Sequence, residues 1–339
     1  MRPLLAAWIN ELEKLWRHRR LLIGAITAIV MAMAALSGLS RPAAGSWEDS
    51  ERAEIAHMQQ ALAQAGSPPG PATAARPPAL FDLNASLQQG LALKQYRLEH
   101  QLAPVDWYPM SAAAKTVFQL AFPLYLILAG WLAAEALSQE RAERTITGLL
   151  SLPISRTAIL VAKAAAVLTT TTAALVLGWA LAYIIYGTAH GGWITVTADV
   201  AVLRDPTIAA APSNLLTMPA WTYALASLAL SLLALAAADA LGLLVSTFAR
   251  SAGWSVGTSV AALLLPPGAL VVLTLWLQSP AWTQYLIFAH LQPANLLLDQ
   301  AAPGVPHSSL FMTVAVLAAW TGLMFSASAA AFRWKDELS

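Results

Sequence analysis

The stretch EALSQERAERTITGLLSLPISRTAILVAK (135–163) separates two long apolar runs of the chain. The run before it is TVFQLAFPLYLILAGWLAAEALS (116–138), and the run after it is AILVAKAAAVLTTTTAALVLGWALAYIIY (158–186). Each run is long enough to cross a bilayer, because a membrane-spanning helix needs about 20 mostly apolar residues. A connection this short and this charged cannot fold alone, so we expect a partner outside the membrane to bind it.

The composition places the chain among membrane proteins. Hydrophobic residues make up 58% of its 339 residues and charged residues 11%, whereas a soluble domain carries about 25% charged residues. The absence of cysteine excludes disulfides, thiolate zinc sites and cysteine nucleophiles. The sequence also contains no G-x-x-x-x-G-K-[ST] motif, so the chain has no loop of that kind to bind nucleotide phosphates.

The hydropathy pattern predicts an all-α membrane protein with six transmembrane helices, at 21–39, 116–138, 158–186, 220–247, 255–277 and 309–332. Arg17, Arg19 and Arg20 precede the first span, whereas the segment 278–308 contains no lysine or arginine. Because cytoplasmic loops are enriched in lysine and arginine, we expect both termini on the cytoplasmic side. The membrane is expected to be a bacterial inner membrane. In an alternative interpretation, the first span is a secretory signal.

The N-terminal segment 1–20 is predicted to form a cytoplasmic amphipathic helix at the membrane surface. Its apolar side repeats at helical spacing and consists of Leu5, Trp8, Ile9, Leu12, Leu15 and Trp16. Its polar side carries Glu11, Glu13, Lys14 and Arg17. This pattern suits the headgroup layer, although a cytosolic helix that packs on a partner would show the same pattern.

The segment 40–115 is predicted to be a helical extracellular insert between spans one and two. Residues 46–66 and 86–102 have helical composition, and the proline-rich stretch between them interrupts any helix. We expect a helical hairpin here, and a partly disordered loop is the alternative. The remaining predicted segments are a cytoplasmic loop at 139–157, an outer loop at 187–219, an outer re-entrant segment at 278–308 and a cytoplasmic tail at 333–339.

The string ERAERTITGLLSLPISRTAILVAK (140–163) resembles the signature of the type-2 export permeases of ATP-binding-cassette (ABC) transporters, the ABC-2 family. That signature has an acidic and basic start, a leucine pair, a Leu-Pro-Ile-Ser-Arg string and a later lysine, here Lys163. Arg144 stands where glycine is usual. NELEKLWRHRRLL (10–22) resembles the family's elbow helix, and LGLLVSTFARSAG (241–253) resembles the end of its fourth span.

The resemblance implies the membrane-spanning permease subunit of an ABC exporter, which is not itself an enzyme. Two permeases, of the same or a related chain, would form the pore, and cassette ATPase subunits that bind ATP and magnesium would dock beneath them. The segment 139–152 would be a coupling helix that inserts into the ATPase, and no cofactor would bind this chain itself. The implied ATPase-coupling residues are Glu140, Arg141, Glu143, Arg144, Thr145, Leu149 and Leu150. The implied cargo is amphipathic, lipid-like or peptide-like.

Several polar or small residues lie within the predicted spans. Asp239 is either a substrate or proton site or a hydrogen-bonded packing residue, since a carboxylate at that depth is costly. Lys163 is expected to extend toward the inner surface, and the threonines at 169–172 to bond their own helix backbone. Gly253 and Gly257 form a G-x-x-x-G, which is a weak dimerisation signal.

Two other functional classes remain open. A proton-coupled secondary transporter would use Asp239, and a non-transporting membrane partner of an ATPase would signal or pull through the insert.

Overall fold

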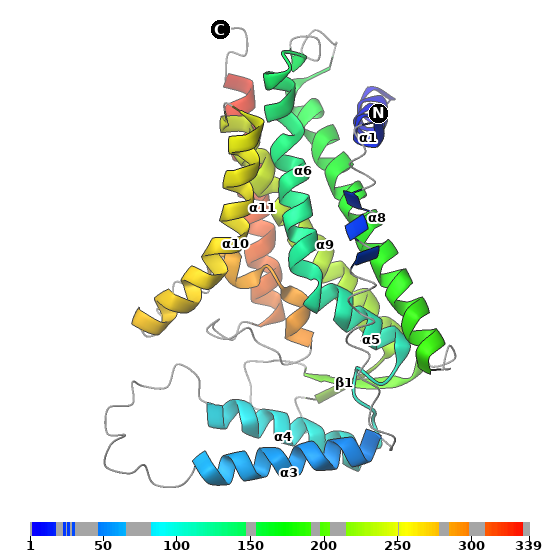
Figure 1. The fold of residues 1–339 in the computed structure, drawn as a ribbon. Helices are drawn as coiled ribbons and strands as arrows, with labels where there is room; N and C mark the ends of the chain where they lie inside the picture. Colours follow the sequence, from blue (N-terminus) through cyan, green and yellow to red (C-terminus); the bar gives the residue numbers. More distant parts are fainter. Residues whose placement is uncertain are drawn as a thin grey trace.

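The computed structural model describes residues 2–17, 23–24, 26–27, 29–30, 47–65, 83–146, 154–190, 197–203, 215–249, 251–277, 285–297 and 309–334. Its fold is mostly helical (Figure 1). The helices of the bundle are α6 (Phe122–Ala142), α8 (Arg156–His190), α9 (Ala220–Phe248), α10 (Ala252–Leu277) and α11 (Leu310–Trp334). The helix α1 (Arg2–Arg17) lies beside the bundle, and the hairpin of α3 (Trp47–Ala65) and α4 (Leu83–Glu99) lies at the opposite end.

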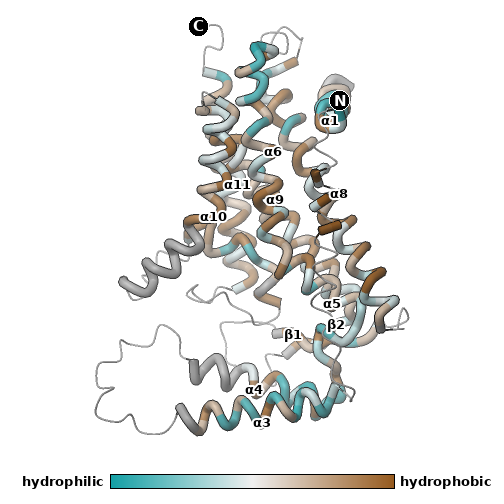
Figure 2. Tube along the Cα trace, viewed as in Figure 1, coloured by the Kyte–Doolittle hydropathy of each residue, from teal (hydrophilic) through white to brown (hydrophobic). Residues whose placement is uncertain are grey.

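The bundle has two distinct ends. Helix α1 and the C-terminal end of α11 lie at one of them, which we call the terminal end (Figure 1). The α3–α4 hairpin and the short helix α5 (Pro109–Lys115) lie at the other, which we call the insert end. The middle of the bundle is hydrophobic, and hydrophilic residues are concentrated in the hairpin and near the terminal end (Figure 2).

Length and composition qualify three of the described helices as membrane spans. They are Arg156–Ala189, Ala220–Phe248 and Leu310–Trp334. The pair Pro109–Leu120 and Phe122–Ala142 qualifies as one span bent by 51°, and α10 contributes the shorter apolar stretch Ala252–Leu265. The chain therefore has three described spans, or four if the bent pair is one span. Most of the predicted first span (21–39) lies outside the described residues.

The predicted span at 116–138 falls on the bent pair of helices, and the chain changes direction near the start of the predicted range. A π-helix, η2 (Thr116–Leu120), follows α5, and α6 begins only after Ala121. Pro123 in the first turn of α6 has no amide hydrogen to continue the preceding ladder. The bend turns α5 away from the axis of α6 (Figure 1).

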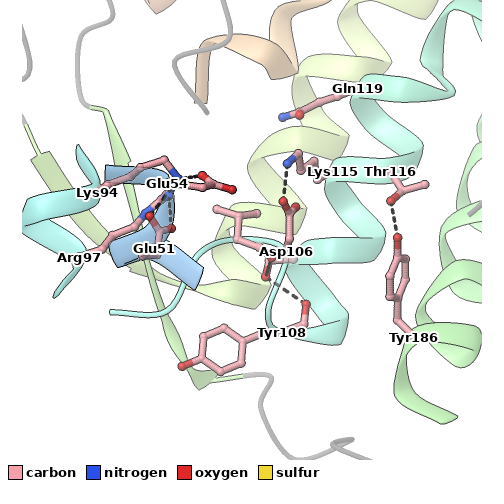
Figure 3. Close-up of polar contacts among 12 residues, drawn as sticks. Glu51, Glu54, Lys94, Arg97, Asp106, Tyr108, Lys115, Thr116, Gln119 and Tyr186 are labelled. Atoms are coloured by element: carbon pink, nitrogen blue, oxygen red, sulfur yellow. Dashed lines mark hydrogen bonds and ion pairs between the residues drawn. The ribbon is translucent and has the colours of Figure 1, made fainter. Parts of the chain in front are cut away.

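Buried polar contacts hold this bent segment in place. Gln119 in η2 donates from Nε2 to Tyr223 Oη and to the Ala294 carbonyl, each at 3.0 Å. Thr116 Oγ1 lies 3.0 Å from Tyr186 Oη, a contact drawn in Figure 3. The segment η2 is thus bonded to α8, to α9 and to the 3₁₀ turn η7 (Pro293–Leu297), which lies in the predicted re-entrant segment 278–308.

The chain is not purely helical, which corrects the all-α prediction. Within the predicted outer loop 187–219, β1 (Asp199–Leu203) pairs antiparallel with β2 (Leu215–Pro219). Val200 and Val202 are buried, so the strand pair places apolar side chains in the core at the insert end. The 3₁₀ turn η6 (Ile287–His290) also lies in the segment 278–308.

The insert contains the predicted helical hairpin, at least over the described residues. Glu51 is buried and forms two ion pairs (Figure 3). Lys94 Nζ lies 2.9 Å from Glu51 Oε2, and Arg97 Nη1 lies 3.5 Å from Glu51 Oε1. Beyond the hairpin, Lys115 of α5 pairs with Asp106 at 2.6 Å. Acidic residues from α3 and basic residues from α4 therefore hold the two helices together.

Small residues let α6 pack closely against two neighbours. A Cβ atom added at Gly242 of α9 would lie 2.6 Å from the Gly130 carbonyl oxygen of α6. On another side of α6, Ser255 and Ser259 of α10 donate to the carbonyls of Ala134 at 2.7 Å and Gly130 at 3.1 Å. Gly130 is therefore a point at which three helices lie close together, as small residues permit in membrane bundles.

Candidate functional site

The signature segment begins inside α6 and not in a separate helix. Glu140 and Arg141 belong to the last turn of α6, which ends at Ala142. The first residues of the coupling helix expected at 139–152 therefore continue α6, and residues 147–152 lie outside the described part of the chain. Ile146 is buried, and Leu149 and Leu150 lie outside the described residues.

A left-handed residue ends α6. Arg144 has φ 58°, and the amide of Thr145 donates to the Glu140 carbonyl at 2.9 Å. Helices commonly end in this way with glycine, which alone adopts a positive φ without steric cost. Glycine is usual at this position in the family that the signature resembles, and the left-handed backbone explains that preference. In this chain Arg144 adopts the same conformation at a steric cost.

We predict that Arg144→Gly raises the free energy of unfolding by about 1 kcal/mol, because it relieves the left-handed strain of a side chain with Cβ. Chemical denaturation in mixed micelles would measure the change. Glu143→Gly is the matched control: Glu143 has φ −83°, so glycine there is expected to destabilise by about 0.5–1 kcal/mol. Equal effects of the two substitutions would contradict the prediction.

Two of the three arginines of the signature, Arg141 and Arg156, stabilise the ends of other helices. Arg141 Nη1 donates to the carbonyls of Ser246 at 2.7 Å and Thr247 at 3.0 Å, in the last turn of α9. Arg156 Nη1 donates to the carbonyls of Phe332 at 3.2 Å and Arg333 at 3.3 Å, in the last turn of α11. The last carbonyls of a helix have no partner within it and carry partial negative charge, so a guanidinium suits both places.

Serines of the signature and of the α9 end also serve as helix contacts. Ser155 precedes α8, and its Oγ accepts the Ala158 amide at 3.2 Å, as an N-cap does. Ser246 Oγ accepts the amides of Leu137 and Ser138 of α6, each at 3.0 Å. We call the connection between α6 and α8, residues 143–155, the signature loop. The end of α6 before it is bonded to α9, and the start of α8 after it is bonded to α11.

Four charged side chains form a closed ring at the terminal end, which we call the charge ring. It consists of Glu11, Lys14, Glu140 and Lys163. Lys163 Nζ lies 3.0 Å from Glu11 Oε2 and 2.8 Å from Glu140 Oε1. Lys14 Nζ lies 2.7 Å from Glu11 Oε1 and 2.8 Å from the same Glu140 oxygen. Each lysine thus contacts both carboxylates, and the ring joins α1, α6 and α8.

The charge ring is buried in spite of its four charges. The Lys163 side chain is 1% exposed, Glu140 13% and Glu11 12%, and only Lys14, at 38%, reaches solvent substantially. Lys163 was expected to extend to the surface, and that expectation is wrong because it finds two carboxylates within the protein. Glu140 lies in this interior ring, whereas Glu143, Arg144 and Thr145 are exposed.

The ring changes the interpretation of α1. Glu11 and Lys14 face α6 and α8 together with Leu15, although the sequence assigned these charges to the side away from the apolar residues. Leu5, Ile9 and Trp16 form an exposed apolar surface. One part of the predicted apolar side, with Leu15, therefore packs against the bundle, and the remainder faces outward.

The opposite charges of the ring shift the pKa values of two of its members, Glu11 and Lys14. Burial opposes ionisation of Glu11, but Lys163 and Lys14 outweigh it, so the pKa of Glu11 lies below its ordinary value of 4.5. Burial likewise opposes the charge of Lys14, but Glu11 and Glu140 outweigh it and raise its pKa. Both directions favour the ionised forms of Glu11 and Lys14 near neutral pH.

We predict that the ring loses its stabilising effect in acid. A carboxylate with a depressed folded-state pKa contributes stability above its unfolded pKa, and loses it as the pH falls through the folded value. The difference in unfolding midpoint between the wild type and Glu11→Gln should therefore be constant from neutral pH to about 5 and shrink below the ordinary value of 4.5. Thermal unfolding in detergent at several pH values measures this, and a difference that grows in acid would contradict it.

Asp239 lies buried in α9 at 4% exposure. Among the described residues it has no hydrogen bond or ion pair, and its Oδ1 is buried without a partner. Three of the four threonines predicted to bond their own helix, Thr169, Thr170 and Thr171, donate to carbonyls one turn earlier in α8. Gly253 and Gly257 have open space on the α10 surface.

The residues that the sequence did not identify are chiefly those that form ion pairs or hydrogen bonds with residues of another helix. They are Glu11 and Lys14 as members of the ring, Ser246 as an acceptor for α6 amides, and Gln119 as the link between η2 and α9. The available signal was Lys163, a lysine within an apolar run that requires a carboxylate nearby. The described residues contain no group of histidine, aspartate and glutamate that could hold a metal ion.

Comparison with known proteins agrees with the elements described above. A search of curated proteins finds no match to this chain. The family model for "ABC-2 family transporter protein" matches residues 5–336 and so covers α1, the signature segment and all the described helices of the bundle. The chain therefore belongs to the ABC-2 family of transporter proteins.

Proposed function

We propose that this chain is the permease subunit of an ABC exporter and that a separate ATPase docks at its terminal end. The observation that carries the proposal is the exposed turn of Glu143, Arg144 and Thr145, which projects beyond α6 at that end. The turn is short and begins from a helix whose last residues are bonded to α1, α8 and α9. A force applied to it therefore acts on several helices together.

The terminal end would face the cytoplasm of the bacterial inner membrane, with both termini there. The family assignment supports an ATPase partner, and ATP hydrolysis would occur in that chain. The exposed apolar residues of α1 would lie among lipid headgroups, as amphipathic surface helices do. The cargo would be amphipathic, and the α3–α4 hairpin would cover the outer mouth.

The docking surface is tested by charge reversal at exposed residues alone. The double variant Glu143→Arg with Arg144→Glu is expected to lower co-purification of the cassette ATPase by roughly tenfold. ATP turnover of the complex should fall by a similar factor. An effect of this size lies within the range for charged residues at protein interfaces. Glu140 is unsuitable for this test, because reversing its charge would break the interior ring.

Glu13→Arg with Arg17→Glu provides the matched control. These two residues form an exposed pair at 2.5 Å on α1, at the same end of the bundle. The control is expected to retain docking and turnover. Docking that survives the Glu143 and Arg144 reversal, with normal turnover, would count against this surface.

A second permease would pack against the outward surface of α10. An added Cβ at Gly253 or Gly257 would meet no atom within 4 Å, and Trp254, Leu264 and Leu265 are exposed on the same helix. Since the chain has no native cysteine, Gly257→Cys alone is expected to give an intermolecular disulfide in membranes if α10 lies at the dimer axis.

The proton-coupled alternative would rest on Asp239, the buried carboxylate without a partner among the described residues. It is distinguished by Asp239→Asn, which would abolish a pH-driven flux in that case. For an ATP-driven permease, the same variant is expected to keep its ATPase-dependent transport.

A further inference from the structure

The charge ring joins a helix at the N-terminus to the two helices on either side of the signature loop. Glu11 and Lys14 come from α1, Glu140 from the last turn of α6, and Lys163 from the third turn of α8. The contacts span 126 and 152 residues of sequence. No connecting segment therefore forces α1 to follow the loop, and the ring is the charged link that binds them.

The ring is built for mechanical stiffness. Charges alternate around it, so every neighbouring pair is attractive, and each lysine bridges both carboxylates at 2.7–3.0 Å. Moving α1 away would leave Glu11 and Lys163 apart in a buried site, where an uncompensated charge is very unfavourable. On α1, Leu15 is buried in the hydrophobic core, and Trp8 and Leu12 pack against that core.

The other charges of α1 provide an internal comparison. Glu13 and Arg17 pair with each other within α1 at 2.5 Å, with side chains 54% and 74% exposed. An exposed pair of this kind contributes little and links no elements. The four charges between Glu11 and Arg17 thus fall into one pair that serves only the helix and one that joins it to α6 and α8.

We propose that Lys163 is a positioning residue that latches α1 to the signature loop, so that the two move as one body when an ATPase displaces the loop. This inference rests on the proposed function for its last step. In this arrangement α1 transmits the displacement to the membrane surface, where its exposed Leu5, Ile9 and Trp16 lie. The ring is therefore needed for coupling and not for docking.

The first experiment measures the latch without any ATPase. Spin labels at Glu13→Cys and Glu143→Cys report the distance between α1 and the loop in nanodiscs, and the chain has no cysteine of its own. The wild-type ring is expected to give a narrow distance distribution. Lys163→Met should broaden it, and Lys14→Gln, at the half-exposed member of the ring, should do so to a smaller degree. Unchanged distributions in both variants would overturn the latch.

A reversed ring supplies the rescue. The fourfold variant Glu11→Lys, Lys14→Glu, Glu140→Lys and Lys163→Glu keeps every neighbouring pair attractive with opposite signs. Its distribution of distances between the two spin labels is expected to be narrower than that of the single variant Lys163→Glu. If Lys163→Met does not fold, the proposal is still tested by Lys14→Gln and by the comparison of Lys163→Glu with the reversed ring. A distance distribution for the reversed ring that is no narrower than the one for Lys163→Glu would overturn the proposal.

The second experiment separates docking from coupling in the complex with the co-purifying ATPase. Lys14→Gln is expected to retain ATPase co-purification while ATP turnover of the complex falls roughly fivefold, at the lower end of common coupling effects. Glu13→Gln, on the exposed pair, should change neither. Turnover unchanged in Lys14→Gln would overturn the coupling role. Failure of the wild type to bind any ATPase would instead overturn the proposed function, while the distance measurements would still test the latch.

Discussion

Lys163→Met is expected to lower the free energy of unfolding by about 3–5 kcal/mol, the cost of breaking a buried ion pair by removing one partner. The Lys163 side chain is 1% exposed and lies within 3.0 Å of two carboxylates. Its removal leaves Glu11 and Glu140 buried with only Lys14 between them. The loss is large because the remaining charges stay in the protein and cannot regain water.

Denaturation in mixed micelles measures this loss, and Arg17→Met is the matched control. Arg17 pairs with Glu13 at the surface, so its replacement should change stability by less than about 1 kcal/mol. Replacing all four members of the ring by uncharged residues is expected to recover much of the loss, because removing a whole buried ion network is far cheaper than removing one partner. A loss for Lys163→Met no larger than for Arg17→Met would show that the ring contributes little.

Gly242→Ala is expected to destabilise the bundle by about 1–3 kcal/mol, the range for overpacking a close contact. The added methyl would lie 2.6 Å from the Gly130 carbonyl oxygen and 2.7 Å from Ala133 Cβ. Backbone atoms cannot turn aside, so α6 and α9 must separate. The change should be smaller for Gly130→Ala, because the atom nearest to the added methyl is the end of a flexible side chain, Leu263 Cδ1.

Gly257→Ala is the matched control for these two substitutions. An added Cβ there has nothing within 4 Å, and alanine is favoured over glycine in a helix by up to about 1 kcal/mol. The control should therefore leave stability unchanged or raise it. Thermal unfolding in the same detergent ranks the three variants, and a ranking in which Gly257→Ala is the most damaging would refute the packing account.

The long helices follow from the sequence with little ambiguity. Apolar runs predict spans at 220–247 and 309–332, and α9 and α11 cover Ala220–Phe248 and Leu310–Trp334. Their ends are marked by polar or charged residues, so hydropathy alone defines them well. The α3–α4 hairpin follows from the proline-rich stretch between two helical patterns.

Long-range polar contacts could not be predicted in the same way. Glu11 and Glu13 are equivalent by composition, yet only Glu11 reaches Lys163, because helix phase and the docking angle of α1 decide which carboxylate faces inward. The bend before α6 depends on a single π-turn, which leaves no period in the sequence. The pairing of β1 with β2 joins two short segments of a loop, and its register is set by tertiary packing.

The π-turn at Thr116–Leu120 also has an evolutionary consequence. A π-turn is an α-turn that contains one surplus residue. Deleting one residue there would restore an ordinary ladder and rotate α5 by about 100° about its axis, the angle that one α-helical residue subtends. Because α5 is buried against the bundle, a single-residue deletion at this turn would therefore force α5 to present a different face to its neighbours.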